Sequence, residues 1–160
     1  MIISRPAYPA NHKFPDLDLQ TIAAYIRNEV NITFATALNN RSAITSFTVE
    51  NTNRLPNSSS IYPLLKIFRN EESFIFPMDE GNIVSLTIAY VLSHSPKDTA
   101  SGLTTHVARE ICRILQNSEI DDVIPFTIDK EQGITITYDT FLTTDVVYDY
   151  AKINCSVFAY

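Results

Sequence analysis

Glycine is scarce in this sequence, with 3 residues among 160. Loops that cradle phosphate groups depend on glycine, and the sequence contains neither a GxxxxGK[ST] nor a GxGxxG pattern. Charge is sparse too: Asp, Glu, Lys and Arg make up 19% of the residues, where a soluble domain usually has about a quarter. We therefore expect no phosphate-binding loop, and a surface that is partly covered by partners.

Basic residues are fewer than acidic ones, 12 against 18, which gives a formal net charge of −6. A nucleic-acid-binding face needs clustered Lys and Arg, so this class is disfavoured. No apolar run approaches the roughly 20 residues of a membrane span, and Pro and polar residues interrupt any signal-peptide pattern at the N-terminus. Cys112 and Cys155 form no CxxC motif, so we expect buried free thiols in a protein made in a reducing cytoplasm.

Two amphipathic helices are expected. Proline recurs through residues 1–17 without any periodic pattern, which predicts an extended arm, and residues 18–160 then form a single domain. Apolar residues at every fourth position predict a helix over 19–38, whose last turns are weakened by β-branched residues. A second apolar stripe predicts a helix over 99–117. The two stripes consist of Ile22, Ile26, Val30, Phe34 and Leu38, and of Leu103, Val107, Ile111 and Leu115.

The remaining periodic segments predict strands. They lie at 42–51, 61–69, 83–94, 123–129, 134–141 and 147–160, and the segment 123–129 is expected to form a hairpin with 134–141 around a turn at 130–133. Apolar side chains at Val84, Leu86, Ile88, Tyr90 and Leu92 share one parity of residues 83–94, and this alternation is strong enough to set the register of the strand. This order of helices and strands predicts an α+β fold. Both helices should pack on one face of a mixed or antiparallel sheet of four to six strands.

The last strand has two different faces. One parity is small and apolar, from Ala151 to Ala159, and the other carries Tyr150, Phe158 and Tyr160. We expect the apolar parity to meet the helices and the aromatic one to meet a neighbouring subunit or a lumen. Stacking of nucleic-acid bases on these aromatics is less favoured, because Asp139, Asp145 and Asp149 flank them.

Candidate catalytic residues are few. The three histidines, at 12, 94 and 106, have no metal-ligand spacing, and we expect solvated or capping side chains. His94 and Ser95 adjoin but lack the surroundings of a nucleophile elbow. The acid pairs at 79–80 and 121–122 lack the ligand pattern of a calcium loop. Cys112 falls on an apolar helix stripe. The sequence therefore predicts no catalytic, cofactor or metal site.

The order of the segments resembles the tail terminator proteins of long-tailed bacteriophages, also described among phage neck or minor tail proteins. The resemblance covers roughly residues 18–160 and lies in an amphipathic helix followed by "YPLLKIFRNEESF", "GNIVSLTIAYVLSH", "LTTHVAREICRIL", "ITITYDTF" and "YAKINCSVFAY". It rests on element order and hydrophobic rhythm, and the family has no catalytic motif to carry over. The arm at 1–17 and the stretch at 41–60 depart from the family's pattern.

The resemblance implies a non-enzymatic virion protein of the tail or neck, made in the host cytoplasm. Such subunits form a ring, usually a hexamer, that caps the tail tube, ends its polymerisation and joins it to the head-tail connector or stopper. DNA passes through the lumen without specific binding, which a negative net charge suits. The two departing segments are candidates for binding tail sheath or connector proteins. No cofactor and no membrane contact are implied.

A ring needs two different complementary patches on each subunit. Apolar residues in the acidic loop 70–82 and aromatic residues of the last strand are the predicted interface, namely Phe74, Ile75, Phe76, Tyr148, Tyr150, Phe158 and Tyr160. The Phe74→Ser, Phe76→Ser double variant is expected to dissolve the ring without unfolding the subunit. Two alternatives stay open: another phage connector, such as a stopper, adaptor or tube initiator, and a small α+β enzyme or ligand-binding module that uses the tyrosine-rich face.

Overall fold

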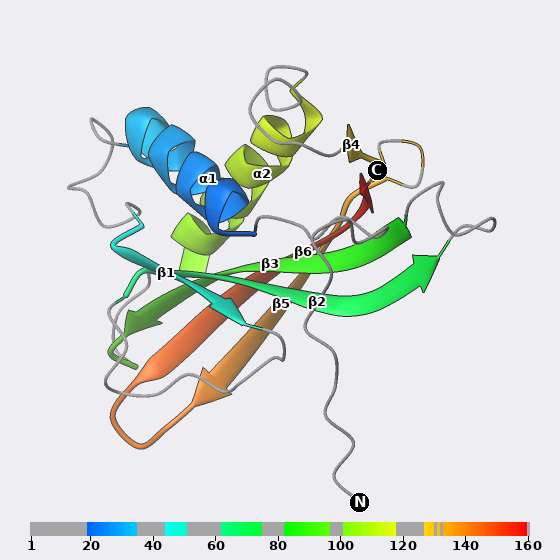
Figure 1. Ribbon diagram of the computed structural model, residues 1–160. Helices are drawn as coiled ribbons and strands as arrows, with labels where there is room; N and C mark the ends of the chain where they lie inside the picture. The colour runs from blue at the N-terminus through cyan, green and yellow to red at the C-terminus, as the bar shows by residue number, and fades with distance from the viewer. Residues whose placement is uncertain are drawn as a thin grey trace, which may run out of the picture.

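The fold consists of two helices over one sheet (Figure 1). The computed structural model describes residues 19–34, 44–50, 62–74, 82–96, 101–117, 127–129, 131 and 133–159. The helices are α1 (Leu19–Phe34) and α2 (Ser101–Gln116). The strands are β1 (Ser46–Glu50), β2 (Leu64–Phe74), β3 (Asn82–His94), β4 (Thr127–Ile128), β5 (Thr135–Leu142) and β6 (Val147–Ala159).

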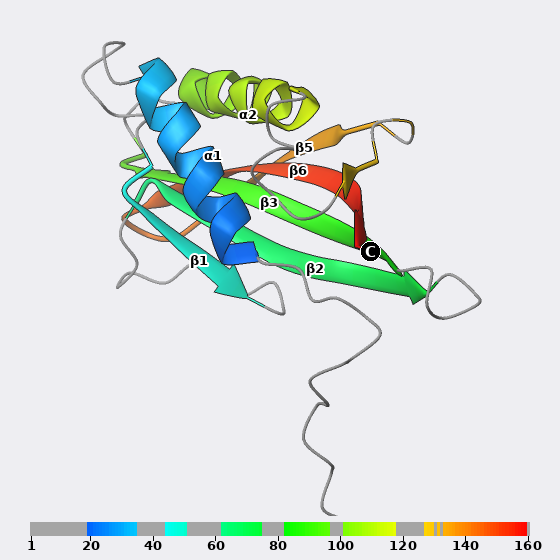
Figure 2. The same cartoon turned by 45° about the horizontal axis from the view of Figure 1, so that its top comes forward.

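The sheet is mixed. Its order is β1-β2-β3-β6-β4, and β5 pairs with β6 as well. β1 runs parallel to β2, and every other pairing is antiparallel. Figure 2 shows both helices on the same side of the sheet, α1 beside the β1 edge and α2 over β6. The α+β fold predicted from the sequence is therefore confirmed.

The core lies between the helices and the sheet. Within the described residues, both predicted helix stripes are buried there: Ile22, Ile26 and Val30 of α1 and Val107, Ile111 and Leu115 of α2 are almost inaccessible, and Leu103 is partly buried. Residues 35–38 of the first predicted helix lie outside the described residues. The apolar parity of the last strand faces the same core, as predicted, because alternate residues of a strand point to opposite faces. The buried core residues of the two central strands are Val84, Leu86, Ile88, Tyr90 and Leu92 of β3, and Ala151, Ile153, Cys155 and Val157 of β6.

The predicted hairpin between 123–129 and 134–141 is wrong. β4 and β5 do not pair with each other; both pair with β6, on the edge opposite β3. Thr127 lies opposite Phe158 and Thr135 opposite Asn154, so the two segments follow one another along a single interrupted edge strand. Gly133, with φ of 77°, lies in the interruption, where a left-handed conformation favours glycine. The hairpin that does form joins β5 to β6.

β2 is longer than predicted. Its pattern was expected to break at residue 70, but the strand continues to Phe74. The register with β3 shifts between Arg69 and Glu71, so Asn70 is the extra residue of a bulge. Its side chain donates to Thr87 Oγ1 at 2.6 Å, and that hydroxyl in turn donates to Asn154 Oδ1 at 2.8 Å. A bulge interrupts strict alternation, which is why the sequence pattern fades while the strand goes on.

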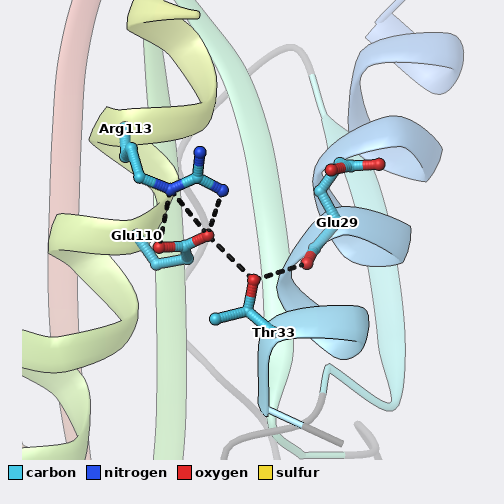
Figure 3. A network of polar contacts seen from close by, with 4 residues as sticks. All are labelled: Glu29, Thr33, Glu110 and Arg113. Atoms are coloured by element: carbon cyan, nitrogen blue, oxygen red, sulfur yellow. Dashed lines mark hydrogen bonds and ion pairs between the residues drawn. The ribbon is translucent and has the colours of Figure 1, made fainter.

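Side-chain hydrogen bonds attach α1 to its neighbours. Asn31 accepts from the backbone N–H of Ile44 at 2.7 Å and donates to the carbonyl of Ile44 at 3.1 Å, which fixes the chain just before β1. Thr33 lies 2.9 Å from Glu110 Oε1 of α2, and Arg113 donates to the same carboxylate (Figure 3). The hydrogen bond from Arg113 is the main cause that lowers the pKa of Glu110.

Candidate functional site

A polar cluster joins three strands at the end of the sheet near α2. His94 ends β3, Asp149 lies in β6 and Thr140 lies in β5. His94 Nε2 is 2.5 Å from Asp149 Oδ2, and Thr140 Oγ1 donates to Asp149 Oδ1 at 3.1 Å. The side chains of His94 and Asp149 are only 7% and 12% exposed. The expectation of a solvated histidine at position 94 is therefore wrong, because Asp149 comes beside it only when β6 pairs with β3.

The partners of the His94 ring indicate what chemistry this cluster can support. The other ring nitrogen of His94, Nδ1, is 2.8 Å from the carbonyl of Ser95. Both ring nitrogens therefore lie within hydrogen-bond distance of an oxygen atom. A nucleophile–base pair needs a hydroxyl or thiol in contact with the ring, whereas Thr140 contacts the carboxylate. The geometry is suited to holding β3, β6 and β5 together.

A pocket of about 290 Å³ adjoins this cluster. It is bounded by the first turn of α2 and by β5 and β6, through Gly102, Thr104, Thr105, Tyr138, Asp139, Thr140, Asp149 and Tyr150. Thr104 is 3% exposed, and its hydroxyl has no hydrogen-bond partner among the described residues. Burying an unpartnered hydroxyl is unfavourable, so a polar ligand group at this wall of the pocket could add a hydrogen bond.

Two of the predicted interface residues lie inside the chain. Tyr148 and Tyr150 are 5% and 7% exposed. They belong to a second, smaller apolar cluster on the sheet face away from the helices, with Leu64, Phe68, Ala89 and Val91. The Tyr148 ring also packs on the rings of Tyr62 and Phe141, with distances between ring centroids of 5.3 and 6.3 Å. Their predicted contact with a neighbouring subunit stays a prediction, and their burial gives both rings a role in stability.

The other predicted interface residues are spread along the sheet. Phe74 ends β2 and Phe158 lies near the end of β6, opposite Ile83 of β3. Asn82, opposite Phe74 across the β2–β3 pairing, adjoins Ile83, so these two positions are close in the sheet. Ile75, Phe76 and Tyr160 lie outside the described residues, as does the arm at 1–17.

Among the described residues, the most exposed large apolar side chains lie elsewhere. Tyr138, Phe141 and Leu142 of β5 are 52%, 37% and 69% exposed, and Ile32 of α1 is 71% exposed. One feature of the segment "ITITYDTFL" could have indicated this exposure: apolar residues occupy both parities at its end, and a strand with one buried face covers only one of them. Alternate residues of a strand point to opposite faces, so Tyr138 and Leu142 share one face of β5, and Phe141 lies on the other face beside Tyr148. Exposed large apolar side chains of this kind are candidates for contact with a partner.

The cysteines lie in or beside the core. Cys155 is buried, and burial raises the pKa of its thiol to about 12. Cys112 is half-buried, and its pKa is raised for the same reason. Both are free thiols, as expected. Thiolate is the reactive form of cysteine, so neither environment favours nucleophilic chemistry.

A metal site and a membrane-spanning helix are two further features that bear on function. Among the described residues, no three His, Cys, Asp or Glu side chains gather as a metal site requires. None of the described helices is both long enough and apolar enough to cross a bilayer. The sequence matches no model of a known protein family and no curated protein.

Proposed function

We propose that this chain is a structural protein of a bacteriophage virion that forms a ring at the end of the tail tube. The ring, a hexamer by the family resemblance, ends tube polymerisation and joins the tail to the head-tail connector. Its partners are further copies of itself, the tail-tube protein and the connector or stopper protein, with tail sheath as a further candidate. DNA passes through its lumen without specific binding.

The observation that carries this proposal is the exposed apolar strand β5. Tyr138, Phe141 and Leu142 lie on the outermost strand of the sheet, where a neighbouring subunit has access to them. Phe141 already packs in part on Tyr148, but Tyr138 and Leu142 leave most of their apolar surface exposed in the monomer, and an assembly subunit would bury it.

Two further features support it. The elements follow the order on which the resemblance rests: α1, β2, β3, α2, β5 and β6. The net charge of −6 disfavours adhesion of the passing DNA to the walls of a lumen. Another phage connector would share the charge, but adaptors tend to be helical and stoppers are small barrels, so the two helices over one sheet favour the terminator.

A ligand-binding module is the second candidate function. The pocket beside α2, with the unpartnered hydroxyl of Thr104, is the observation that favours it. Its walls also include Asp139 and Asp149, so a ligand would have to be neutral or cationic overall. We rank this candidate lower, because the carboxylate of Asp149 already has His94 and Thr140 as partners.

The test is the mass of the purified chain by sedimentation velocity, alone and with the tail-tube protein of the same virus. A ring-sized species, or a monomer that becomes a ring only at tube ends, supports the proposal. The chain should also shorten tubes when it is added during their polymerisation, as judged by electron microscopy. A monomer that neither binds tubes nor changes their length would overturn the proposal, and ligand screening of the pocket would follow.

A further inference from the structure

The sheet has an open edge on each side. Among the described strands, β1 pairs with β2 and β5 pairs with β6, and neither has a second strand along its outer edge. Figure 2 shows these two strands at opposite sides of the sheet. Natural proteins usually protect such edges with Lys, Pro or a bulge. β5, with the sequence TITYDTFL, contains no Lys or Pro, and its register with β6 is unbroken.

The two open edges lie at the same level of the sheet. In the register of the sheet, Ser46 of β1 is aligned with Asp139 of β5. The residues between them in the same row are Leu64 of β2, Val91 of β3 and Tyr150 of β6. Glu50 of β1 is likewise aligned with Thr135 of β5, and the row between them contains Phe68, Thr87 and Asn154. All five residues of β1 therefore lie level with residues 135–139 of β5.

The two edges also run in opposite directions. β1 is parallel to β2, and each of the three steps from β2 through β3 and β6 to β5 is antiparallel. A second copy placed beside the first in the same orientation would bring its β1 antiparallel to β5. Antiparallel pairing is the more common arrangement between strands, and it would keep the helices of all copies on one side of the sheet.

We propose that subunits join edge to edge: the outer edge of β5 in one copy pairs antiparallel with the outer edge of β1 in the next copy. The occupant of the open edge is thus a second copy of this chain. The contact is heterologous, because two different surfaces meet, and repeated contacts of this kind close into a ring when the rotation allows it. The inference rests on the proposed ring and assigns its subunit contact.

The β5–β6 hairpin indicates which backbone groups face the neighbour. Thr143 donates its N–H to the carbonyl of Val146 at 2.9 Å, which makes these two a hydrogen-bonded pair. Hydrogen-bonded and non-hydrogen-bonded pairs alternate along an antiparallel ladder. By that alternation, the N–H groups of Tyr138, Thr140 and Leu142 point away from β6. The N–H of Thr140 already donates to Asp139 Oδ1 at 2.8 Å, so Tyr138 and Leu142 are the positions to test. Proline at such a position removes an outward N–H and leaves the pairing with β6 in place.

The experiment compares two proline variants with size-matched controls. In Tyr138→Pro and Leu142→Pro, the concentration at which half of the chain is assembled should rise at least about tenfold, since each variant removes an intersubunit hydrogen bond and an apolar contact. Tyr138→Thr and Leu142→Thr retain the N–H, so their shift should be smaller. Circular dichroism and thermal melting of the dilute monomer show whether each variant keeps its fold. Assembly equal to the wild type in folded proline variants would overturn the inference.

Crosslinking provides a readout that does not depend on proline. Thr48→Cys is combined in turn with Thr135→Cys, Thr137→Cys or Asp139→Cys, which occupy one face of β5. Mild oxidation of the assembled protein should give covalent chains of subunits for at least one combination, and none for the single variants. A ring that forms but yields no crosslinked chains would overturn the edge contact and leave the proposed function standing. A wild-type chain that never assembles, alone or with tube protein, would overturn both.

Discussion

His94 and Asp149 are 55 positions apart in the sequence, and their side chains meet at 2.5 Å between β3 and β6. Both side chains are almost fully covered, at 7% and 12% exposure. Removing one partner of a buried hydrogen-bonded pair leaves the other with a lost hydrogen bond away from water, which costs more than losing an exposed contact. The contact therefore connects the register of the two central strands to the stability of the whole fold.

His94→Ala should lower the free energy of unfolding by about 1–3 kcal/mol, because it removes one hydrogen bond from the buried carboxylate of Asp149, which still accepts from Thr140. Urea unfolding followed by circular dichroism measures the change. His106→Ala is the matched control, since His106 is exposed on α2 and should change stability by less than about 0.5 kcal/mol. Equal effects of the two variants would show that the pair does not stabilise the fold.

Tyr148→Ala should destabilise the monomer by about 3 kcal/mol, because the ring is buried in the second apolar cluster. Tyr138→Ala on the adjacent strand is the control, with a ring that is 52% exposed, and should cost less than about 1 kcal/mol. Thermal and urea unfolding of dilute protein measure both. If Tyr148→Ala weakens assembly while the monomer keeps its stability, Tyr148 acts at an interface and its burial within the subunit is unimportant.

Glu110→Gln should destabilise the fold at neutral pH and have less effect in acid. The pKa of Glu110 is lowered from 4.5 in the folded state, first by the hydrogen bond from Arg113. A lowered folded-state pKa contributes stability that is complete above the unfolded value and is lost as the pH falls through the folded value. Arg113 is 56% exposed, so solvent screening limits the effect to less than about 1 kcal/mol.

Unfolding curves of wild type and Glu110→Gln at pH 7 and at pH 3 measure that difference. Arg109→Gln is the control, because Arg109 is exposed on the same helix. A difference that stays constant between the two pH values would mean that the charge of Glu110 contributes nothing.

The thiols should react slowly in the native protein at pH 8, with Cys155 slower than Cys112. Burial raises both pKa values, that of Cys155 to about 12, which cuts its thiolate fraction roughly a thousandfold relative to an ordinary thiol. A chromogenic disulfide reagent measures the rates in buffer and in urea, and Cys112→Ala assigns the two phases. Rapid reaction of Cys155 in buffer would mean that the β6 side of the core opens readily.

Asn31→Ala should cost about 1–2 kcal/mol, since it leaves the N–H and the carbonyl of Ile44 without their side-chain partner. Asn31→Asp keeps the acceptor for the N–H and removes only the donor, so its cost should be smaller. Unfolding in urea separates the two variants. Similar stability of Asn31→Ala and wild type would mean that water replaces both hydrogen bonds.

Local patterns in the sequence determined the helices, the faces of the central strands and the fold class. The stripe at Ile22, Ile26 and Val30 and the alternation from Val84 to Leu92 each lie within one element, where side-chain direction follows from backbone geometry alone. The scarcity of glycine and of basic residues likewise sufficed to set aside phosphate-binding loops and a nucleic-acid-binding face.

Tertiary structure alone decided which segments lie side by side. The order β1-β2-β3-β6 places His94 beside Asp149 and leaves β1 and β5 on opposite edges, and no local pattern encodes either relationship. The interrupted edge strand of β4 and β5 resembles a hairpin in sequence, because a turn with glycine has the same pattern in both arrangements. The aromatic parity of the last strand predicts an interface at Tyr148 and Tyr150, but burial depends on what the folded chain packs against that face, which a single strand's sequence does not specify.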